Sequence, residues 1–388
     1  MNLRFGFPIA ASALAILSGC TNIDRSFSLS FSDSDFKAVT NLTQTGAIPA
    51  DLKRLEVDNR FGNVRVVGSE KDPVEWTWKL TVRARTEALA QLGAAQAACN
   101  AQRDGDRLRL VVSLPETDRK YRVQSDLDLR LPKPAAVRVQ NRFGSIEISD
   151  VDGELEATGQ HGAMELRNIG APVRAQTSFA IQKVSATGPA SLKNQHGAIE
   201  AANIRGPLTA ETSFGAILAQ NITGPVKVRN QHGKVEVRHA GPADLRTCFA
   251  MLSAKGIEGD AILVNEHGHL EASEVSGSLH ATTSFESLDL TTAGPSVVCH
   301  NQHGPIRIHV TSAMLTNLQA TTSFGPLEVS LPAGLKPALQ ARTSFAEIES
   351  DFPVLMKLRG TDPFADAPPD TPRISVENSH GRIRVMRH

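Results

Sequence analysis

A short motif recurs through most of this 388-residue chain at nearly constant spacing, and this repetition limits the folds that the chain can adopt. Each copy carries Phe or His at one position. Between residues 143 and 303 that position recurs every 17 or 18 residues, and Phe alternates with His. We call these residues the anchors: Phe143, His161, Phe179, His196, Phe214, His232, Phe249, His267, Phe285, His303, Phe324, Phe345 and His380. Phe61 lies in an earlier variant of the motif.

The sequence around the anchors predicts short strands. One form of the motif is Thr-Ser-Phe, as at 212–214, and the other is Asn-Gln-His-Gly, as at 230–233. An alternating run such as Lys234–Val237 follows, then a turn with Gly. Alternation with period two is typical of strands. Strands this short cannot bury a face alone but can do so when stacked. The sequence therefore predicts an all-β fold, a parallel β-solenoid (β-helix) of 17–21-residue repeats.

The number of residues in one coil of the solenoid stays open. A coil of 36 residues would stack Asn on Asn and His on His, and hydrogen bonds between Asn side chains would favour it by about 1 kcal/mol each. It would also stack Glu165, Glu200, Glu236 and Glu271, which costs a few tenths to about 1 kcal/mol per like-charged pair. A coil of 18 residues separates these carboxylates.

Four segments are expected along the chain. Residues 1–20 form a lipoprotein signal peptide, and the polar residues 21–50 suit a tether. Residues 51–133 form a small α+β cap with strands around a helix at 87–101. Residues 134–388 form the solenoid, interrupted by a Pro-rich loop at 351–373.

The first twenty residues predict the cellular address. Arg4 precedes an apolar stretch, Phe5–Leu17, which is too short to span a bilayer. The stretch ends in Leu-Ser-Gly-Cys, which resembles the bacterial lipobox, and this resemblance implies lipidation of Cys20. Thr21 in place of Asp implies the outer membrane by the same resemblance. The alternative is a plain signal peptide that contains a Cys. The membrane, reached through this lipid, is the first expected partner.

Charge and cysteine content narrow the function classes. Lys and Arg together number 41, as do Asp and Glu, so no nucleic-acid partner is expected. Besides Cys20, the chain has Cys99, Cys248 and Cys299, without CxxC spacing. Three cysteines in this pattern predict small buried apolar residues and no disulfide framework or zinc site.

The anchor histidines are the main candidates for chemistry. Six of the 12 histidines occupy the anchor position, so a column of His could bind zinc or copper or respond to pH. Phe at the equivalent position favours packing, because Phe cannot bind a metal. We therefore expect the anchors to pack inward, no metal and no cofactor. On this interpretation Phe249→Ala costs about 3–5 kcal/mol of stability.

Two function classes remain. The first is a lipid-anchored, non-enzymatic envelope or surface protein whose solenoid binds an envelope protein or a glycan. The second is a carbohydrate-active β-helix enzyme that uses the repeated glutamates. An active site would be a local exception to the repeat, whereas these glutamates recur throughout it. No nucleophile, phosphate-binding or H-E-x-x-H motif occurs, and no catalytic residue is predicted.

The chain resembles the bacterial putative-adhesin family DUF4097 over residues 50–388. The features that carry the resemblance are an early strand with Trp76 and Trp78, an Ala-rich helix at 87–101, a strand ending in Leu131-Pro132, and tandem units beginning at Phe143-Gly144. The resemblance implies a solenoid of adhesin type without defined catalytic residues. Phe or His stands at the anchor where such repeats more often have small polar residues.

Overall fold

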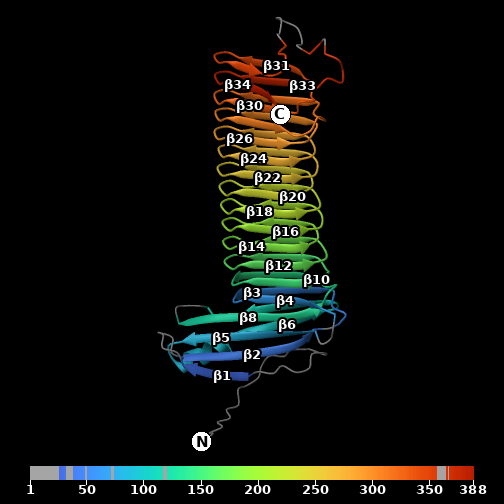
Figure 1. Cartoon of the computed structure of the whole chain (residues 1–388). Coiled ribbons are helices and arrows are strands. Elements are labelled where there is room, and N and C mark those ends of the chain that lie inside the picture. The colour runs from blue at the N-terminus through green and yellow to red at the C-terminus, as the bar shows by residue number, and fades with distance from the viewer. Residues whose placement is uncertain are drawn as a thin grey trace.

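The fold is a long two-sheeted parallel β-solenoid that rises from an antiparallel cap (Figure 1). The computed structural model describes residues 26–31, 38–48, 50–70, 74–116, 120–355, 364–365 and 367–388. Within these residues the chain forms two sheets, and nearly all strand pairs between residues 136 and 388 are parallel. The predicted all-β solenoid is confirmed.

We call the two sheets A and B. Sheet A runs in spatial order β1 (Ser26–Phe31), β2 (Ala38–Ile48), β5 (Val74–Ala84), β8 (Tyr121–Pro132), β4 (Val64–Ser69), β10 (Ile146–Val151), β12 (Met164–Ile169), β14 (Gln182–Thr187), β16 (Ile199–Ile204), β18 (Ile217–Ile222), β20 (Val235–Ala240), β22 (Leu252–Ile257), β24 (Leu270–Val275), β26 (Leu288–Thr292), β28 (Ile306–Val310), β30 (Leu327–Leu331), β34 (Ile383–Arg387) and β32 (Ile348–Ser350).

Sheet B runs in spatial order β6 (Ala98–Asp104), β7 (Arg107–Ser113), β3 (Arg54–Phe61), β9 (Ala136–Phe143), β11 (Leu155–Gly159), β13 (Val173–Gln176), β15 (Ala190–Lys193), β17 (Leu208–Glu211), β19 (Val226–Arg229), β21 (Ala243–Thr247), β23 (Ala261–Asn265), β25 (Leu279–Thr283), β27 (Ser296–Asn301), β29 (Asn317–Thr322), β33 (Arg373–Asn378) and β31 (Ala338–Thr343).

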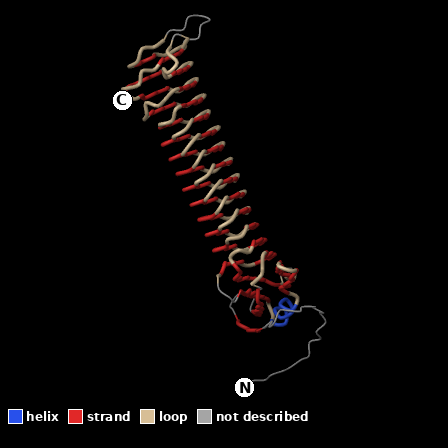
Figure 2. Tube along the Cα trace, turned by 90° about the vertical axis from the view of Figure 1, so that its right-hand side faces the viewer, coloured by secondary structure: helices blue, strands red, loops and turns tan. Residues whose placement is uncertain are grey.

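One coil of the regular array contains 17 or 18 residues. Strand β18 pairs with β20 so that Ile217 lies opposite Val235, and β19 pairs with β21 so that Val226 lies opposite Ala243. Each coil therefore adds one strand to each sheet, and Figure 2 shows the coils stacked like rungs. The open question of coil length is settled: 36 residues make two coils, and from Phe143 to His303 coils with Phe and coils with His alternate.

The core lies between the two sheets and is built from columns of alternate residues. In β20, Val235 and Val237 are fully buried, and Glu236 between them faces outward. The same alternation recurs in nearly every coil, so Ile, Leu, Val and Ala stack on their equivalents one coil away. Gln182 is an exception: it is fully buried, and its Oε1 atom has no hydrogen-bond partner.

Both ends of the array contain a coil that is out of sequence order. At the N-terminal end, β3 and β4 lie between the later strands β7–β8 and β9–β10. At the C-terminal end, β33 and β34 insert between β29–β30 and β31–β32. The last coil of the sequence is therefore the second-to-last coil in space.

The cap closes the N-terminal end of the solenoid. Strands β1, β2, β5 and β8 pair antiparallel, and helix α1 (Glu87–Ala95) packs on β2 and β5. The expected tether over 21–50 is wrong for Ser26–Phe31 and Ala38–Ile48, which pair as strands β1 and β2, and Leu42 and Ile48 of β2 are buried. The expected helix at 87–101 is too long, because residues 98–104 pair with β7 as strand β6.

The remaining sequence expectations concern the signal segment and the cysteines. Cys20 and the signal segment lie outside the described residues, and no helix within the described residues is long and apolar enough to cross a membrane. Cys99 and Cys299 are free and buried as expected, and burial raises the pKa of each thiol to about 12. Cys248 is free but only half-buried, which the sequence interpretation missed.

Candidate interaction surface: an aromatic ridge

The anchors form one continuous stack of rings along an edge of the solenoid. Successive ring centroids lie 4.7–5.3 Å apart. We call this stack the aromatic ridge. Its order is Phe61, Phe143, His161, Phe179, His196, Phe214, His232, Phe249, His267, Phe285, His303, Phe324, His380 and Phe345.

The out-of-order C-terminal coil preserves the alternation of the ridge. In the sequence, Phe324 is followed by Phe345, which breaks the pattern. In the structure, His380 stacks between them, with centroid distances of 4.9 Å to each ring. The insertion of the coil of His380 between those of Phe324 and Phe345 therefore restores the alternation, and the ridge continues to the last coil.

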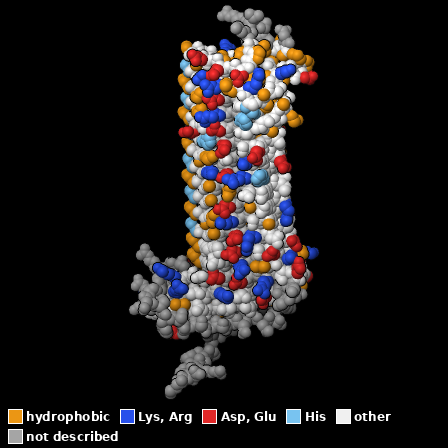
Figure 3. Space-filling view, in the orientation of Figure 1, with side chains coloured by type: hydrophobic (Ala, Val, Ile, Leu, Met, Phe, Trp, Pro, Cys, Tyr) orange, Lys and Arg blue, Asp and Glu red, His pale blue; other side chains and the backbone are white. Residues whose placement is uncertain are grey.

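The ridge faces solvent, and the predicted inward packing of the anchors is wrong. Phe179, Phe214 and Phe249 are 53%, 53% and 55% exposed. The physical reason is that the alternating Val, Leu, Ile and Ala residues of the strands already fill the space between the sheets. Rings at the turns stack on one another along the edge instead. Figure 3 shows hydrophobic and His side chains alternating along this edge.

Asn or Thr stands two positions before most rings, and many of these side chains link the turns of adjacent coils. The Nδ2 group of Asn230 donates to the carbonyl oxygen of Gly215 in the preceding coil at 2.9 Å, and its Oδ1 accepts from the Gly233 amide at 3.3 Å. In the Phe coils, Thr212 Oγ1 donates to Gly197 O at 3.3 Å. Thr283 and Thr322 donate in the same way to Gly268 O and Gly304 O, so in these coils Thr takes the place of Asn. The Oγ1 atoms of Thr177, Thr247 and Thr343 have no hydrogen-bond partner, so this link is absent from those Phe coils.

Only glycine fits directly after a His anchor, because a Cβ atom there would collide with the backbone of the neighbouring coil. A Cβ atom on Gly233 would lie 2.0 Å from the carbonyl oxygen of Gly215. The tight turn that results brings neighbouring coils close enough for their rings to stack.

The geometry of the histidines argues against a metal column. Successive histidines are separated by a Phe ring at 4.7–5.3 Å on each side, so their rings are about 10 Å apart, whereas Zn–N bonds are about 2.0–2.1 Å. Within the described residues no group of three His, Cys, Asp or Glu side chains could hold a metal. His303 Nδ1 lies 3.1 Å from Ser284 O, and since a carbonyl only accepts, that nitrogen donates and Nε2 remains toward solvent.

The flanks of the ridge are small and almost uncharged. From Gln160 to Gly325, the residues directly before and after each ring are Gln, Ser, Cys, Gly or Ala, with Glu266 and Glu286 as exceptions. Glu266 hydrogen-bonds the Cys248 thiol and, after burial, is the second cause that raises the pKa of that thiol. The residues directly beside the rings are therefore mostly uncharged and smaller than the rings themselves.

The repeated glutamates lie on the outer face of sheet A, and Glu165, Glu200 and Glu236 are paired with basic residues. Glu200 contacts Lys183 of the preceding coil at 3.3 Å, and Lys234 contacts Glu236 at 2.7 Å. The Lys234 hydrogen bond lowers the pKa of the Glu236 carboxyl. The pKa shifts resolved for Glu70 and Asp150 are also downward. A general acid for glycoside hydrolysis needs the opposite shift.

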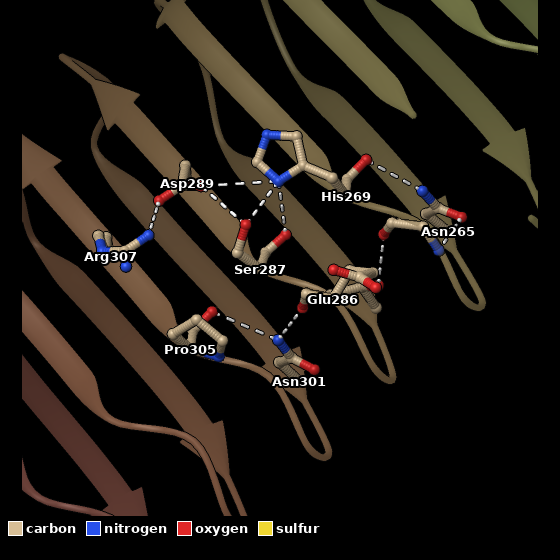
Figure 4. Close-up of polar contacts among 10 residues, drawn as sticks. Asn265, His269, Glu286, Ser287, Asp289, Asn301, Pro305 and Arg307 are labelled. Atoms are coloured by element: carbon tan, nitrogen blue, oxygen red, sulfur yellow. Dashed lines mark hydrogen bonds and ion pairs between the residues drawn. The ribbon is translucent and has the colours of Figure 1, made fainter. Parts of the chain in front are cut away.

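One polar cluster on sheet A has the residue types of a hydrolase triad (Figure 4). His269 Nδ1 lies 2.6 Å from Ser287 Oγ, and Ser287 Oγ donates to Asp289 Oδ2 at 3.0 Å. In a triad, Asp orients one ring nitrogen while Ser uses the other. Here Ser287 and Asp289 both face Nδ1, and Asp289 also pairs with Arg307 at 3.1 Å. The cluster is therefore a hydrogen-bonded network on the surface of the protein. The sequence feature that could have indicated it is His269, a histidine outside the anchor position.

Solved structures that match this chain over 89–90% of its length include three described as adhesion proteins. They are described as a "putative cell adhesion protein" from Clostridium sporogenes (7% identity, 89% of this chain and 99% of that chain, TM-score 0.16), a "putative adhesin" from Bacteroides fragilis (8%, 89% and 96%, 0.18) and a "putative adhesin" from Parabacteroides distasonis (12%, 90% and 97%, 0.16). No family model and no curated protein matches the chain. With TM-scores this low, the fold assignment rests on the strand pairings.

Proposed function

We propose that this protein is a lipid-anchored, non-enzymatic envelope protein that binds its partner through the aromatic ridge, as an adhesion-type scaffold. The observation that carries the proposal is the unbroken ring stack exposed along the solenoid edge. The solenoid supplies a rigid support, and the ridge supplies the contact surface. An envelope protein or a glycan is the proposed class of partner.

The exposed apolar area supports a binding role. An aromatic side chain has about 150–250 Å² of surface. Six Phe residues of the ridge are each 51–77% exposed: Phe179, Phe214, Phe249, Phe285, Phe324 and Phe345. Together they present about 600 Å² or more, the upper range for the largest apolar patch on an ordinary monomer. Burial of such a patch by a partner is favourable by about 25 cal/mol per Å².

The proposed location rests on the N-terminal sequence. The Leu-Ser-Gly-Cys segment ending at Cys20 fits a lipobox, and Thr21 favours the outer membrane, with the solenoid facing the periplasm or the surface. The motif-level resemblance to the putative-adhesin family DUF4097 agrees with this location. A lipid on Cys20 would hold the chain at the membrane because each buried CH₂ contributes about 0.8 kcal/mol.

Two measurements test the proposal. Cells that express Cys20→Ser should incorporate no radiolabelled palmitate into the protein and should release or misprocess it. Palmitate incorporation that survives the substitution would contradict the anchor.

The second measurement is a screen of glycans and envelope proteins for binding to the full chain. Phe214→Ser/Phe249→Ser should lose the binding that the parent shows. Leu218→Ser/Ile262→Ser is the matched control, since these two apolar residues are 38% and 43% exposed but lie on the sheet faces. Equal binding by both double variants would contradict the role of the ridge.

A further inference from the structure

We propose that the partner of the aromatic ridge is a second copy of this chain, with the two ridges packed side by side. The inference rests on the proposed function, because it names the partner of the same surface. Three features of the ridge favour a second copy: the spacing of the rings, the area that they expose, and the chemistry of the residues beside them.

The spacing of the ridge favours a partner with the same spacing. The rings recur every 4.7–5.3 Å, which is the distance between adjacent strands of a sheet. A surface can match such a series over many repeats only if it carries the same period. A second copy meets this condition by construction, because its own rings stand on the same strand spacing.

The area of the ridge is sufficient for a stable dimer. A specific interface buries about 800 Å² on each partner. The six half-exposed Phe residues give about 600 Å² or more, and the six anchor histidines, all exposed, add to that area. Two ridges in contact along most of their length would therefore bury about as much surface as a standard interface requires.

The flanks give room for the second ridge and do not repel it. From Gln160 to Gly325 every ring has a Gly, Ala or Ser directly beside it on at least one side, and this leaves room there for the rings of a partner, whereas Gln or Glu precedes each His ring. Directly beside the rings only Glu266 and Glu286 are charged over this length. Lys193, Glu211 and Arg229 line a hollow one step further out, and because Lys193 and Glu211 form an ion pair, part of the charge there is already neutralised.

The same features argue against a lipid surface as the partner. The rings lie face to face, so only their edges are free to insert. The ridge contains no Trp or Tyr, the residues enriched at membrane interfaces, and no Lys or Arg stands directly before or after a ring from Gln160 to Gly325. A lipid surface is thus the alternative that the test must separate.

Cys248 offers a probe for the proposed contact. It flanks Phe249 near the middle of the ridge, and it is half-buried, whereas Cys99 and Cys299 are buried. When two ridges meet with their middles together, the two copies of Cys248 lie close, whether the chains run parallel or antiparallel. A short bismaleimide should therefore join two chains at this position.

The experiment is bismaleimide cross-linking in cells that express the full chain, read on a denaturing gel. We expect a species of twice the chain mass in the parent and its loss in Cys248→Ser. Phe179→Ser/Phe285→Ser, which alters the ridge away from the probe, should reduce the species at least tenfold. Leu218→Ser/Ile262→Ser should leave it unchanged, and thermal melts establish that each variant is folded.

The proposal is overturned if the parent gives no doubled species, or if the ridge variant gives as much as the parent. It is also overturned if the full chain binds vesicles of zwitterionic or anionic lipid through the ridge and stays uncross-linked. A different result would contradict the proposed function itself. In that case the binding screen would find no glycan, no envelope protein and no second copy of the chain that binds through the ridge. Ridge-dependent capture of a glycan or another protein without cross-linking would leave the proposed function and remove this inference.

Discussion

The inner columns of the solenoid and its outer ridge are built on the same spacing but have opposite surroundings. Leu252 is fully buried in sheet A, and Phe249, three residues earlier in the same coil, is 55% exposed. Both stack on equivalents in the coils on either side. The strands fill the core with aliphatic residues and leave the larger rings at the turn outside.

This difference separates stability from recognition within each coil. The aliphatic columns bury apolar area between the sheets and hold the coils together. The rings gain stacking contacts but keep about half of their surface in water. The ridge can therefore change while the core stays intact, and the following variants test that separation, beginning with the largest expected effect.

A charge in an inner column should prevent folding of the coils around it. Leu245→Asp places a carboxylate at a fully buried site in β21, at a cost above about 5 kcal/mol. Circular dichroism and limited proteolysis should show lost strand content and new cleavage nearby. Thr282→Asp, at an exposed site in β25, is the control and should melt like the parent.

Loss of a turn amide should cost less. Asn230→Ala removes the bonds to Gly215 and Gly233 and leaves their buried groups unpaired, so we expect a loss of about 1–3 kcal/mol in urea unfolding. Gln231→Ala, at the exposed neighbouring site, should be nearly neutral. Equal losses at the two positions would show that the Asn contacts do not hold the turn.

One change to the core should stabilise the protein. Gln182→Met removes a buried Oε1 that has no partner and keeps the shape of the side chain, so we expect a gain of about 1–2 kcal/mol. Gln220→Met, at an exposed site of the same sheet, should give no gain. A lower melting temperature for Gln182→Met would mean that this amide has a structural role.

The smallest effect is expected within the ridge. His232→Phe replaces one stacked ring by another between Phe214 and Phe249, so stability should change by no more than about 0.5 kcal/mol. Zinc or copper should not raise the melting temperature of the parent, because neighbouring histidines cannot share an ion. A metal-dependent rise that His232→Phe abolishes would restore the metal hypothesis.

The sequence predicted the solenoid and the grouping of the anchors, but it did not predict that the anchors face solvent and not the core. The motif spacing placed Phe214 and His232 in equivalent turns, and period-two runs such as Lys234–Val237 identified the strands. Which side a turn residue faces depends on whether the strands already fill the core, and a single repeat does not show this. The Ser and Gln neighbours of each ring were the available signal.

The threading of the ends was also hidden. Pairing of β33 with β29 joins segments more than fifty residues apart, which local patterns cannot specify. The successive Phe324 and Phe345 anchors were the sequence signal for it, since the alternation fails between them in the sequence and is restored in space by His380. Strand β2 was missed because its Thr, Asn and Gln residues read as polar linker.

The most direct test of the account compares Leu252→Ala with Phe249→Ala by equilibrium urea unfolding. The two residues lie in one coil, but Leu252 faces the core and Phe249 faces solvent. We predict a loss of about 2–5 kcal/mol for Leu252→Ala and a smaller loss of about 1–3 kcal/mol for Phe249→Ala, which gives up its stacking on both His232 and His267 at about 0.5–1.5 kcal/mol per pair. An equal or larger loss for Phe249→Ala would place the ridge inside the core and contradict its assignment as a binding surface.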